Sequence, residues 1–344
     1  MAMTSDWSLA LLAVADIRRQ LALRELEPSS RCSPSFSRSY PRRTSMGRRG
    51  ATGLAGILLV DKPAGLTSHD VVARIRRLTG EGRVGHAGTL DPMATGLLVI
   101  LVGPYTRLEP YMSSADKTYN ATITFGSSTD TEDAEGAVVA SAEVPDSVLD
   151  RTFAERVLAG FLGPQKQRPP AYSAIKVNGT VAHRAARSGS PIELAERDIT
   201  VFEAQVLGVD ARQCAWNVSF RVSKGTYIRS LARDLGEAVG VPSHLSGLRR
   251  TASGPLSVED SHRLDELTDV VGAFTDPIAA LGLPVIHVED TMIANGSPLD
   301  IALARGLAVD TDVTVVCNGI LRAIYRVTGD RLVPRVVLPS ADIS

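Results

Sequence analysis

One carboxylate of this 344-residue chain lies in a glycine-bounded loop directly ahead of a continuous apolar run. The loop spans residues 85–96, GHAGTLDPMATG, and its carboxylate is Asp91. Pro92 favours an extended backbone at Asp91, and the glycines allow another chain or a ligand to come close. Because an aspartate before a proline is most often a turn residue, the loop alone predicts either a turn or a catalytic carboxylate. His86, in the same loop, is likewise predicted to be either a structural histidine or a site residue.

A second candidate group is the segment 223–229, SKGTYIR, which joins a strand pattern to a helix pattern. Thr226 is the expected cap of that helix, so Arg229 falls in the first turn, where the helix dipole disfavours a cation. We therefore expect Arg229 to have an anionic partner. Two alternatives are open. Arg229 either pairs with a surface carboxylate or faces solvent, or it pairs with a buried carboxylate, for which Asp91 is the obvious candidate.

Tyr119 opens an alternating strand pattern on its apolar face, which by itself predicts a core tyrosine. The loop that follows, residues 129–136, is acidic enough to suggest calcium. It lacks the DxDxDG order and the distal glutamate of an EF-hand, so we expect no metal there.

The elements that position these residues follow from the hydrophobic periodicity. Apolar or alternating runs predict strands at 57–60, 97–102, 118–125 and 216–222. Helices are expected at 148–162, at 227–239, and from Thr67 or Ser68 to Gly80. These patterns together predict an α+β fold with a mixed sheet.

Two further regions differ from this pattern. From residue 283 onward the strands are short, and Asn318-Gly319 predicts a hairpin turn, which indicates a small β-rich terminal module over 284–344. Residues 165–190 form a polar, basic insertion that we expect to be a mobile loop or arm. Its cations are Lys166, Arg168, Lys176, Arg184 and Arg187.

Composition limits the class of protein. No apolar run approaches the roughly 18 to 20 residues that span a bilayer, and the three scattered cysteines suggest neither a disulfide framework nor a zinc site. We therefore expect a cytoplasmic protein. Residues 1–52 hold nine arginines against four acidic residues, which leaves 28 basic and 34 acidic residues in the rest of the chain. An RNA-binding protein of this charge must concentrate its cations in a local groove.

The first 52 residues combine a short apolar run with an Arg-, Ser- and Pro-rich stretch. A secretory signal is not expected, because Asp6 stands where such a peptide carries positive charge. We expect a disordered extension, with an upstream start codon ahead of Met46.

At this point the sequence resembles a known family. Six blocks occur in the order found in bacterial TruB pseudouridine synthases: residues 56–70, 85–96, 117–119, 169–179, 223–229 and 248–250. The resemblance runs from about Gly56 to at least Ser257.

The resemblance implies a catalytic domain over 53–283, built on a mixed, largely antiparallel sheet, followed by a PUA-like RNA-binding domain over 284–344. It implies isomerisation of the uridine at position 55 in the T arm of tRNA, with no cofactor and no metal. We expect a monomer without an obligatory protein partner. Whether the carboxylate attacks C6 of the base or C1′ of the ribose, or removes a ribose proton, is left open.

The matching motifs carry roles residue by residue. Asp91 takes the place of the nucleophile, and Arg229 that of the arginine paired with it. Tyr119 resembles the tyrosine that stacks on the flipped base and is a candidate acceptor of the C5 proton. The expected substrate-binding residues are His86, Tyr227, Leu248, Lys62 and Lys176. The chain departs from the family pattern at Ala87, at Pro104-Tyr105 and over 181–184, which affects individual RNA contacts and none of the catalytic positions.

Two alternatives remain. His262-Arg263-Leu264-Asp265 mimics the catalytic tetrapeptide of pseudouridine synthases that act on ribosomal RNA, although we expect it to lie in an amphipathic helix. The other alternative is a non-catalytic RNA-binding or tRNA-folding module that uses the PUA-like end.

Overall fold

The computed structural model describes residues 52–339, except positions 178, 189 and 191. The extension expected over 1–52 therefore lies outside the described residues, apart from Thr52. Within the described part of the chain, no helix is long and apolar enough to cross a membrane.

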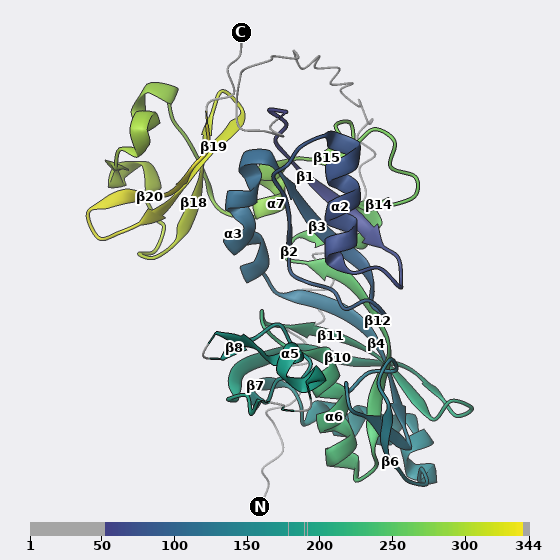
Figure 1. Cartoon of the computed structure of the whole chain (residues 1–344). Coiled ribbons are helices and arrows are strands. Elements are labelled where there is room, and N and C mark those ends of the chain that lie inside the picture. The colour runs from purple at the N-terminus through teal and green to yellow at the C-terminus, as the bar shows by residue number, and fades with distance from the viewer. Residues whose placement is uncertain (1–51, 178, 189, 191, 340–344) are drawn as a thin grey trace, which may run out of the picture. The chain divides into compact units, whose positions relative to one another are not determined.

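An eleven-stranded sheet forms the larger part of the structure (Figure 1). Its main path runs in the order β14-β1-β3-β12-β4-β11-β10-β7, and β2, β13 and β15 pair beside it. The strands are β1 (Gly56–Lys62), β2 (Val84–Ala87), β3 (Thr95–Val102), β4 (Lys117–Phe125), β7 (Gly163–Gln167), β10 (Arg197–Asp210), β11 (Ala215–Val222), β12 (Ser243–Ser253), β13 (Leu256–Ser257), β14 (His262–Arg263) and β15 (Phe274–Thr275). Only the β1–β14 and β3–β12 pairs of this sheet are parallel, so the mixed, largely antiparallel sheet is confirmed.

The alternating strand patterns correspond to a buried sheet face. Tyr119, Ala121, Ile123 and Phe125 of β4 are buried in one apolar cluster with Trp216, Val218, Phe220 and Val222 of β11. The two strands pair directly, with Phe220 opposite Tyr119. Tyr119 is thereby fixed in the core at the start of β4.

Helix α2 (Ser68–Thr79) begins and ends where the sequence predicts. Thr67 and Asp70 form a capping box, and Gly80 closes the helix in the left-handed conformation at φ 66°. The helix expected over 148–162 is shorter: Asp150 accepts a hydrogen bond from the Phe153 N–H, which starts α4 (Arg151–Ala159). A 3-10 helix (Asp146–Leu149) precedes it.

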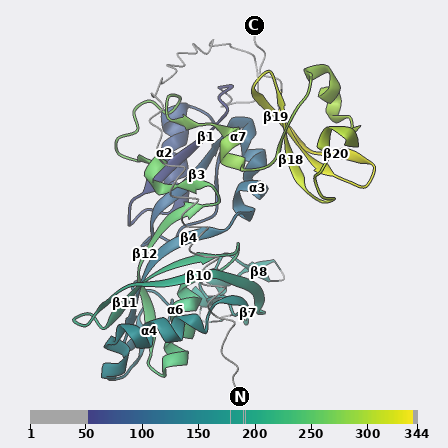
Figure 2. The same ribbon diagram turned by 180° about the vertical axis from the view of Figure 1, so that it is seen from behind.

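Helix α6 (Ile228–Val239) lies beside α4 and packs on β12 (Figure 2). Its N-cap is Tyr227, and no side chain caps it. The expected cap at Thr226 is wrong, because the Thr226 hydroxyl donates to Ser223 O at 2.9 Å instead. The helix therefore starts without a local cap, and its first turn depends on contacts from elsewhere.

Residues 285–337 form a separate five-stranded sheet in the order β16-β18-β19-β20-β17. Its strands are β16 (Val285–His287), β17 (Leu299–Asp300), β18 (Asp312–Cys317), β19 (Ile320–Val327) and β20 (Arg331–Val337). Asn318 and Gly319 turn the β18–β19 hairpin with φ 51° and 76°, so the predicted hairpin is confirmed. The terminal module is β-rich, as expected.

The basic insertion contains regular elements. It holds the hairpin β8 (Lys176–Val177) and β9 (Thr180–Val181), followed by α5 (Ala182–Arg187). The expected start at Gln165 is three residues too early, because β7 extends to Gln167 and pairs with β10 up to that residue. The insertion therefore leaves the edge of the main sheet at Arg168.

Candidate active site

Asp91 and Arg229 form a two-pronged ion pair. Arg229 Nε lies 2.9 Å from Asp91 Oδ2, and Arg229 Nη2 donates to Oδ1 at 3.3 Å. The Asp91 side chain is 35% exposed, whereas that of Arg229 is 7% exposed. The anionic partner expected for a cation in the first turn of α6 is confirmed, and it is the carboxylate of the glycine-bounded loop. One face of this carboxylate is open to a substrate.

The Asp91 loop is fastened on both sides of the carboxylate. On one side, the Ser68 hydroxyl accepts from the Leu90 N–H at 2.9 Å and lies 3.1 Å from Leu90 O. On the other side, Gly96, the second residue of β3, adopts φ 98°, and a Cβ added there would collide with the backbone carbonyl of Arg250. This is the close chain approach that the glycines predict.

Lys62 lies beneath the same loop. Its ammonium donates to Pro63 O at 3.0 Å, to Leu66 O at 2.7 Å and to Pro92 O at 3.2 Å. The residue is fully buried, and burial lowers the pKa of the ammonium to about 8 although the Asp91 carboxylate opposes that shift. A side chain enclosed in this way supports the Asp91 loop. The expected contact between Lys62 and the substrate is not supported.

The acidic loop after β4 surrounds the far side of Arg229. Arg229 Nη1 donates to Thr131 O at 3.1 Å and lies 3.6 Å from Oδ2 of the buried Asp133. Arg229 Nη2 also donates to Tyr172 O, at 3.1 Å. Sequence reasoning missed Asp133. The sequence signal that could have indicated Asp133 is the acidic loop that follows the strand carrying Tyr119.

A second arginine of α6 anchors the same loop. Arg233 Nη1 donates to Glu132 Oε1 at 2.6 Å, and the Ser230 hydroxyl donates to Glu132 Oε2 at 3.1 Å. Glu132 adopts φ 63°, a strained conformation for this residue, and burial raises the pKa of its carboxyl against the influence of Arg233. Glu132 and Asp133 of this loop therefore both contact arginines of α6. Among the described residues, no group of three or more His, Cys, Asp or Glu side chains could hold a metal ion.

Apolar residues and Tyr119 line the surroundings of the loop. Tyr119 is 9% exposed and belongs to the same buried cluster as Leu90 and Ile228, the neighbours in sequence of Asp91 and Arg229. Leu248 of β12 is partly buried and packs against this cluster. The structure therefore brings Asp91 and Arg229 together, and it places Tyr119 and Leu248 in the apolar core that also holds the sequence neighbours of this pair.

His86 is held in β2 with an unusual environment. Its Nδ1 is buried and has no hydrogen-bond partner, and its ring meets that of His69 edge to face at 5.5 Å between centroids. Burial lowers the pKa of His86, and the neighbouring His69 and Arg250 lower it further. These effects favour the neutral form of the His86 imidazole.

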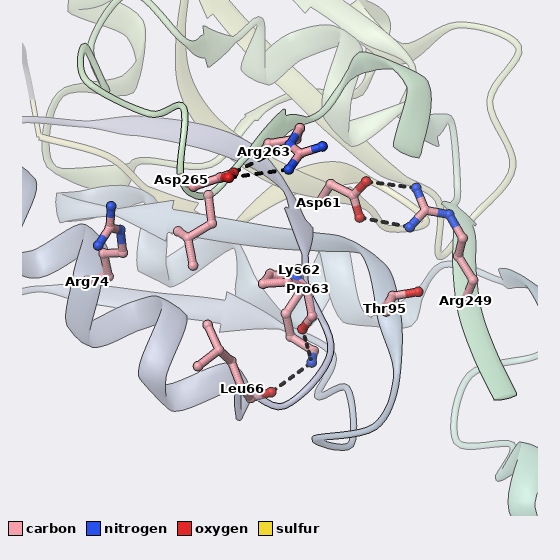
Figure 3. A pocket seen from close by; sticks show the side chains of 10 residues that line it. Asp61, Lys62, Pro63, Leu66, Arg74, Thr95, Arg249, Arg263 and Asp265 are labelled. Atoms are coloured by element: carbon pink, nitrogen blue, oxygen red, sulfur yellow. Dashed lines mark hydrogen bonds and ion pairs between the residues drawn. The ribbon is translucent and has the colours of Figure 1, made fainter. Parts of the chain in front are cut away.

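A cavity of about 450 Å³ lies beside Lys62 (Figure 3). At one edge the Arg249 guanidinium binds the Asp61 carboxylate through two hydrogen bonds of 2.8 and 3.0 Å. At another edge lie the exposed Arg263 and Asp265, 3.3 Å apart. None of Asp91, Tyr119 and Arg229 lines this cavity.

The helix expected around His262 is wrong. His262 and Arg263 form β14 and pair with Val60 and Asp61 of β1. The Asp265 side chain is 71% exposed. The tetrapeptide thus ends at the surface without the enclosed environment found at Asp91.

Comparisons with known proteins identify the family of this chain. The profile of the TruB family pseudouridylate synthase N-terminal domain matches residues 76–228, and that of the tRNA pseudouridylate synthase B C-terminal domain matches residues 229–281. The chain is 52% identical over 218 residues to tRNA pseudouridine synthase B of Thermobifida fusca (strain YX), covering 62% of this chain and 74% of that protein. It belongs to the TruB family of pseudouridylate synthases.

Other members of the TruB family and a more distant structure match a larger part of the chain. The tRNA pseudouridine synthase B of Geobacillus thermodenitrificans (strain NG80-2) is 41% identical over 258 residues, covering 71% of this chain and 85% of that protein. Among solved structures, a chain of a Cbf5-Nop10-Gar1 complex is similar with a TM-score of 0.64 and 26% identity, covering 82% of this chain and 84% of that chain. The fold is therefore that of pseudouridine synthases.

The geometry of this TruB-family site suits covalent chemistry on a planar base. The guanidinium neutralises and orients Asp91 without covering it, which leaves the carboxylate able to attack. Tyr119 and Leu248 belong to the apolar core that also holds Leu90 and Ile228, the sequence neighbours of this pair. Such a site can receive an unstacked base and act on it with protein groups alone.

Proposed function

We propose that this protein converts uridine to pseudouridine at position 55, in the T arm of tRNA. The observation that carries the proposal is the two-pronged, partly exposed Asp91–Arg229 pair in a chain of the TruB family. The related proteins named tRNA pseudouridine synthase B support tRNA as the substrate. Uridine and pseudouridine are isomers, so the reaction needs neither a cofactor nor an input of energy.

In this proposal Asp91 is the nucleophile and Arg229 orients it. Extruding the uridine from its stack costs a few kcal/mol, which contacts in the pocket must offset. Stacking on Tyr119 contributes about 1 to 3 kcal/mol. The Tyr119 hydroxyl is the proposed acceptor of the C5 proton when the base is rejoined through carbon.

Other parts of the chain bind the RNA around that base. Tyr227 and Leu248 border the uridine pocket, and the neutral His86 contacts the T-loop nucleotides. The exposed Lys176 and the rest of the insertion hold the RNA backbone. Residues 53–283 form the catalytic domain, and the PUA-like module over 284–344 binds RNA. The enzyme acts in the cytoplasm as a monomer without an obligatory protein partner.

The purified protein should form one pseudouridine in a T-arm hairpin transcript, at position 55. A transcript with cytidine at that position is the matched control and should remain unmodified. Mapping by carbodiimide labelling and primer extension locates the product. Modification of a ribosomal RNA fragment with no modification of the T arm would overturn the proposed substrate.

The insertion should contribute to affinity through phosphate contacts. Lys176, Arg184 and Arg187 are exposed cations on β8 and α5. Because each phosphate contact adds about one unit to the slope of log affinity against log salt, replacing all three with glutamine should flatten the slope by about three units. Filter binding at several salt concentrations measures the slope. Arg156→Gln, an exposed cation on α4, should leave it unchanged, and an unaltered slope in the triple variant would rule out the arm as an RNA contact.

A further inference from the structure

Gln167, the last residue of β7, holds the main chain of Tyr227 through two hydrogen bonds. Its Nε2 donates to Tyr227 O at 3.0 Å, and its Oε1 accepts from the Tyr227 N–H at 2.8 Å. The residue is 1% exposed, so water does not compete for these bonds. Because α6 begins at Tyr227 without a side-chain cap, the Gln167 amide supplies the support that a local cap would give.

Arg197 of β10 acts on the same tyrosine from the neighbouring strand. It lies directly opposite Gln167 in the β7–β10 pair, and directly opposite residues project from the same face of a sheet. Its guanidinium lies 5.5 Å from the centroid of the Tyr227 ring, within the range of a cation–π interaction. The cross-strand pair therefore contacts both the backbone and the ring of Tyr227.

We propose that Gln167 and Arg197 form a clamp that positions the Tyr227 ring against the flipped uridine. Both are positioning residues, and the inference rests on the proposed place of Tyr227 in the uridine pocket. Gln167 fixes the backbone of Tyr227 at φ −100° and ψ 115°, which sets the direction of its Cα–Cβ bond. Arg197 then limits the rotation of the ring.

The clamp also joins the base of the insertion to the reaction site. Immediately after Gln167, Arg168 O accepts from Arg233 Nη2 at 3.0 Å. Four residues further on, Tyr172 O accepts from Arg229 Nη2 at 3.1 Å. The start of the insertion is therefore fastened to α6 at three points, and Gln167 is the one that reaches the pocket tyrosine.

The test compares Gln167→Met with the wild type in the full-length protein. Methionine keeps most of the buried volume and removes both hydrogen bonds. With saturating tRNA transcript, the single-turnover rate should fall about 10- to 100-fold, because small errors of position are costly in a preorganised site. The dissociation constant for tRNA should change less than about threefold, since Gln167 is buried and contacts no RNA.

Gln165→Met is the matched control. Gln165 lies on the same strand, and its Nε2 donates to a backbone carbonyl, Phe161 O, at 2.7 Å, without touching Tyr227. Its rate should stay within about twofold of the wild type. An equal loss in both variants would mean that β7 as a whole supports the fold, and would overturn the clamp.

Repeating the change in a Tyr227→Ala background identifies the route of the effect. Without the ring, Gln167→Met should lower the rate by less than about threefold further, because coupled residues are not additive. A full further loss, or a fully active Gln167→Met in the wild-type background, overturns the clamp alone. Full activity of Tyr227→Ala overturns both the clamp and the proposed pocket role of Tyr227.

If Gln167→Met unfolds at a markedly lower temperature than the wild type, the clamp is tested with Arg197→Met instead. Its side chain is only half-buried. Losing the ring contact should lower the single-turnover rate about two- to fivefold, and only when Tyr227 is present. A rate that does not change, or that falls equally in the Tyr227→Ala background, overturns the clamp.

Discussion

Replacing Asp91 with asparagine should lower the rate of pseudouridine formation by at least about 10³-fold, while tRNA still binds. Asparagine keeps the size of the side chain and one oxygen for Arg229, but it removes the anionic nucleophile. Single-turnover assays with the T-arm transcript measure the rate, and filter binding measures the affinity, which should stay within about threefold of the wild type.

The fold should tolerate this change. Arg229 retains Thr131 O, Tyr172 O and the Asp133 carboxylate as partners, so its guanidinium is not left as an isolated buried charge. The melting temperature of Asp91→Asn should therefore remain close to that of the wild type. A lost activity accompanied by unfolding would not support a chemical role for Asp91.

Asp265→Asn is the control for the competing tetrapeptide. Its carboxylate is exposed and paired with Arg263, so its loss should leave the rate within about twofold of the wild type. The opposite pattern, with Asp265 essential and Asp91 dispensable, would transfer the chemistry to the ribosomal-type motif and refute the proposed site.

The sequence predicts the regular elements well where local signals agree. Alternation placed β4 and β11, and the Thr67 capping box and Gly80 bounded α2. The expectation at 148–162 failed because Asp150 can cap a helix in the middle of an apolar pattern. The helix expected around the tetrapeptide at 262–265 does not form, because His262 and Arg263 pair with β1. That strand lies about 200 residues away in the sequence, so the pairing leaves no local signal.

The ion pair between Asp91 and Arg229 was one of two alternatives that the residues themselves offered. A cation in the first turn of a helix favours an anionic partner, and the family resemblance then indicated Asp91 as that partner. The buried polar residues that support the surroundings of this pair were not predictable from the sequence. Lys62 and Gln167 are long polar side chains. Lys62 is buried against three backbone carbonyls, and Gln167 against the backbone N–H and C=O of one residue, Tyr227.

The acidic loop illustrates the same difficulty. Its composition suggested calcium, although the EF-hand order is missing, whereas Asp133 and Glu132 face two arginines of α6. The spacing of Arg229 and Arg233, one helical turn apart, places both guanidiniums on one side of α6. Periodicity shows that these cations share a face, but it does not show which loop covers that face.

Arg229→Lys should lower the single-turnover rate by about 10²-fold, even though the positive charge is kept. In the wild type the three guanidinium nitrogens have separate partners: Nε and Nη2 hold the two oxygens of Asp91, and Nη1 reaches Thr131 O. A lysine ammonium concentrates its donors on one atom and cannot reproduce this planar arrangement. The carboxylate would remain neutralised but would be free to rotate.

Arg229→Met removes the positive charge that Arg229→Lys keeps. Comparing the two variants separates the effect of the charge from the effect of orienting Asp91. Arg229→Met should be slower than Arg229→Lys and less stable, because Asp133 would then be a buried carboxylate without its cation. Arg221→Lys is the matched control, since Arg221 also bridges two carboxylates, those of Glu203 and Asp116, and does not pair with Asp91. Its rate should stay within about twofold of the wild type. A fully active Arg229→Lys enzyme would show that charge alone suffices and that the planar fork does not orient Asp91.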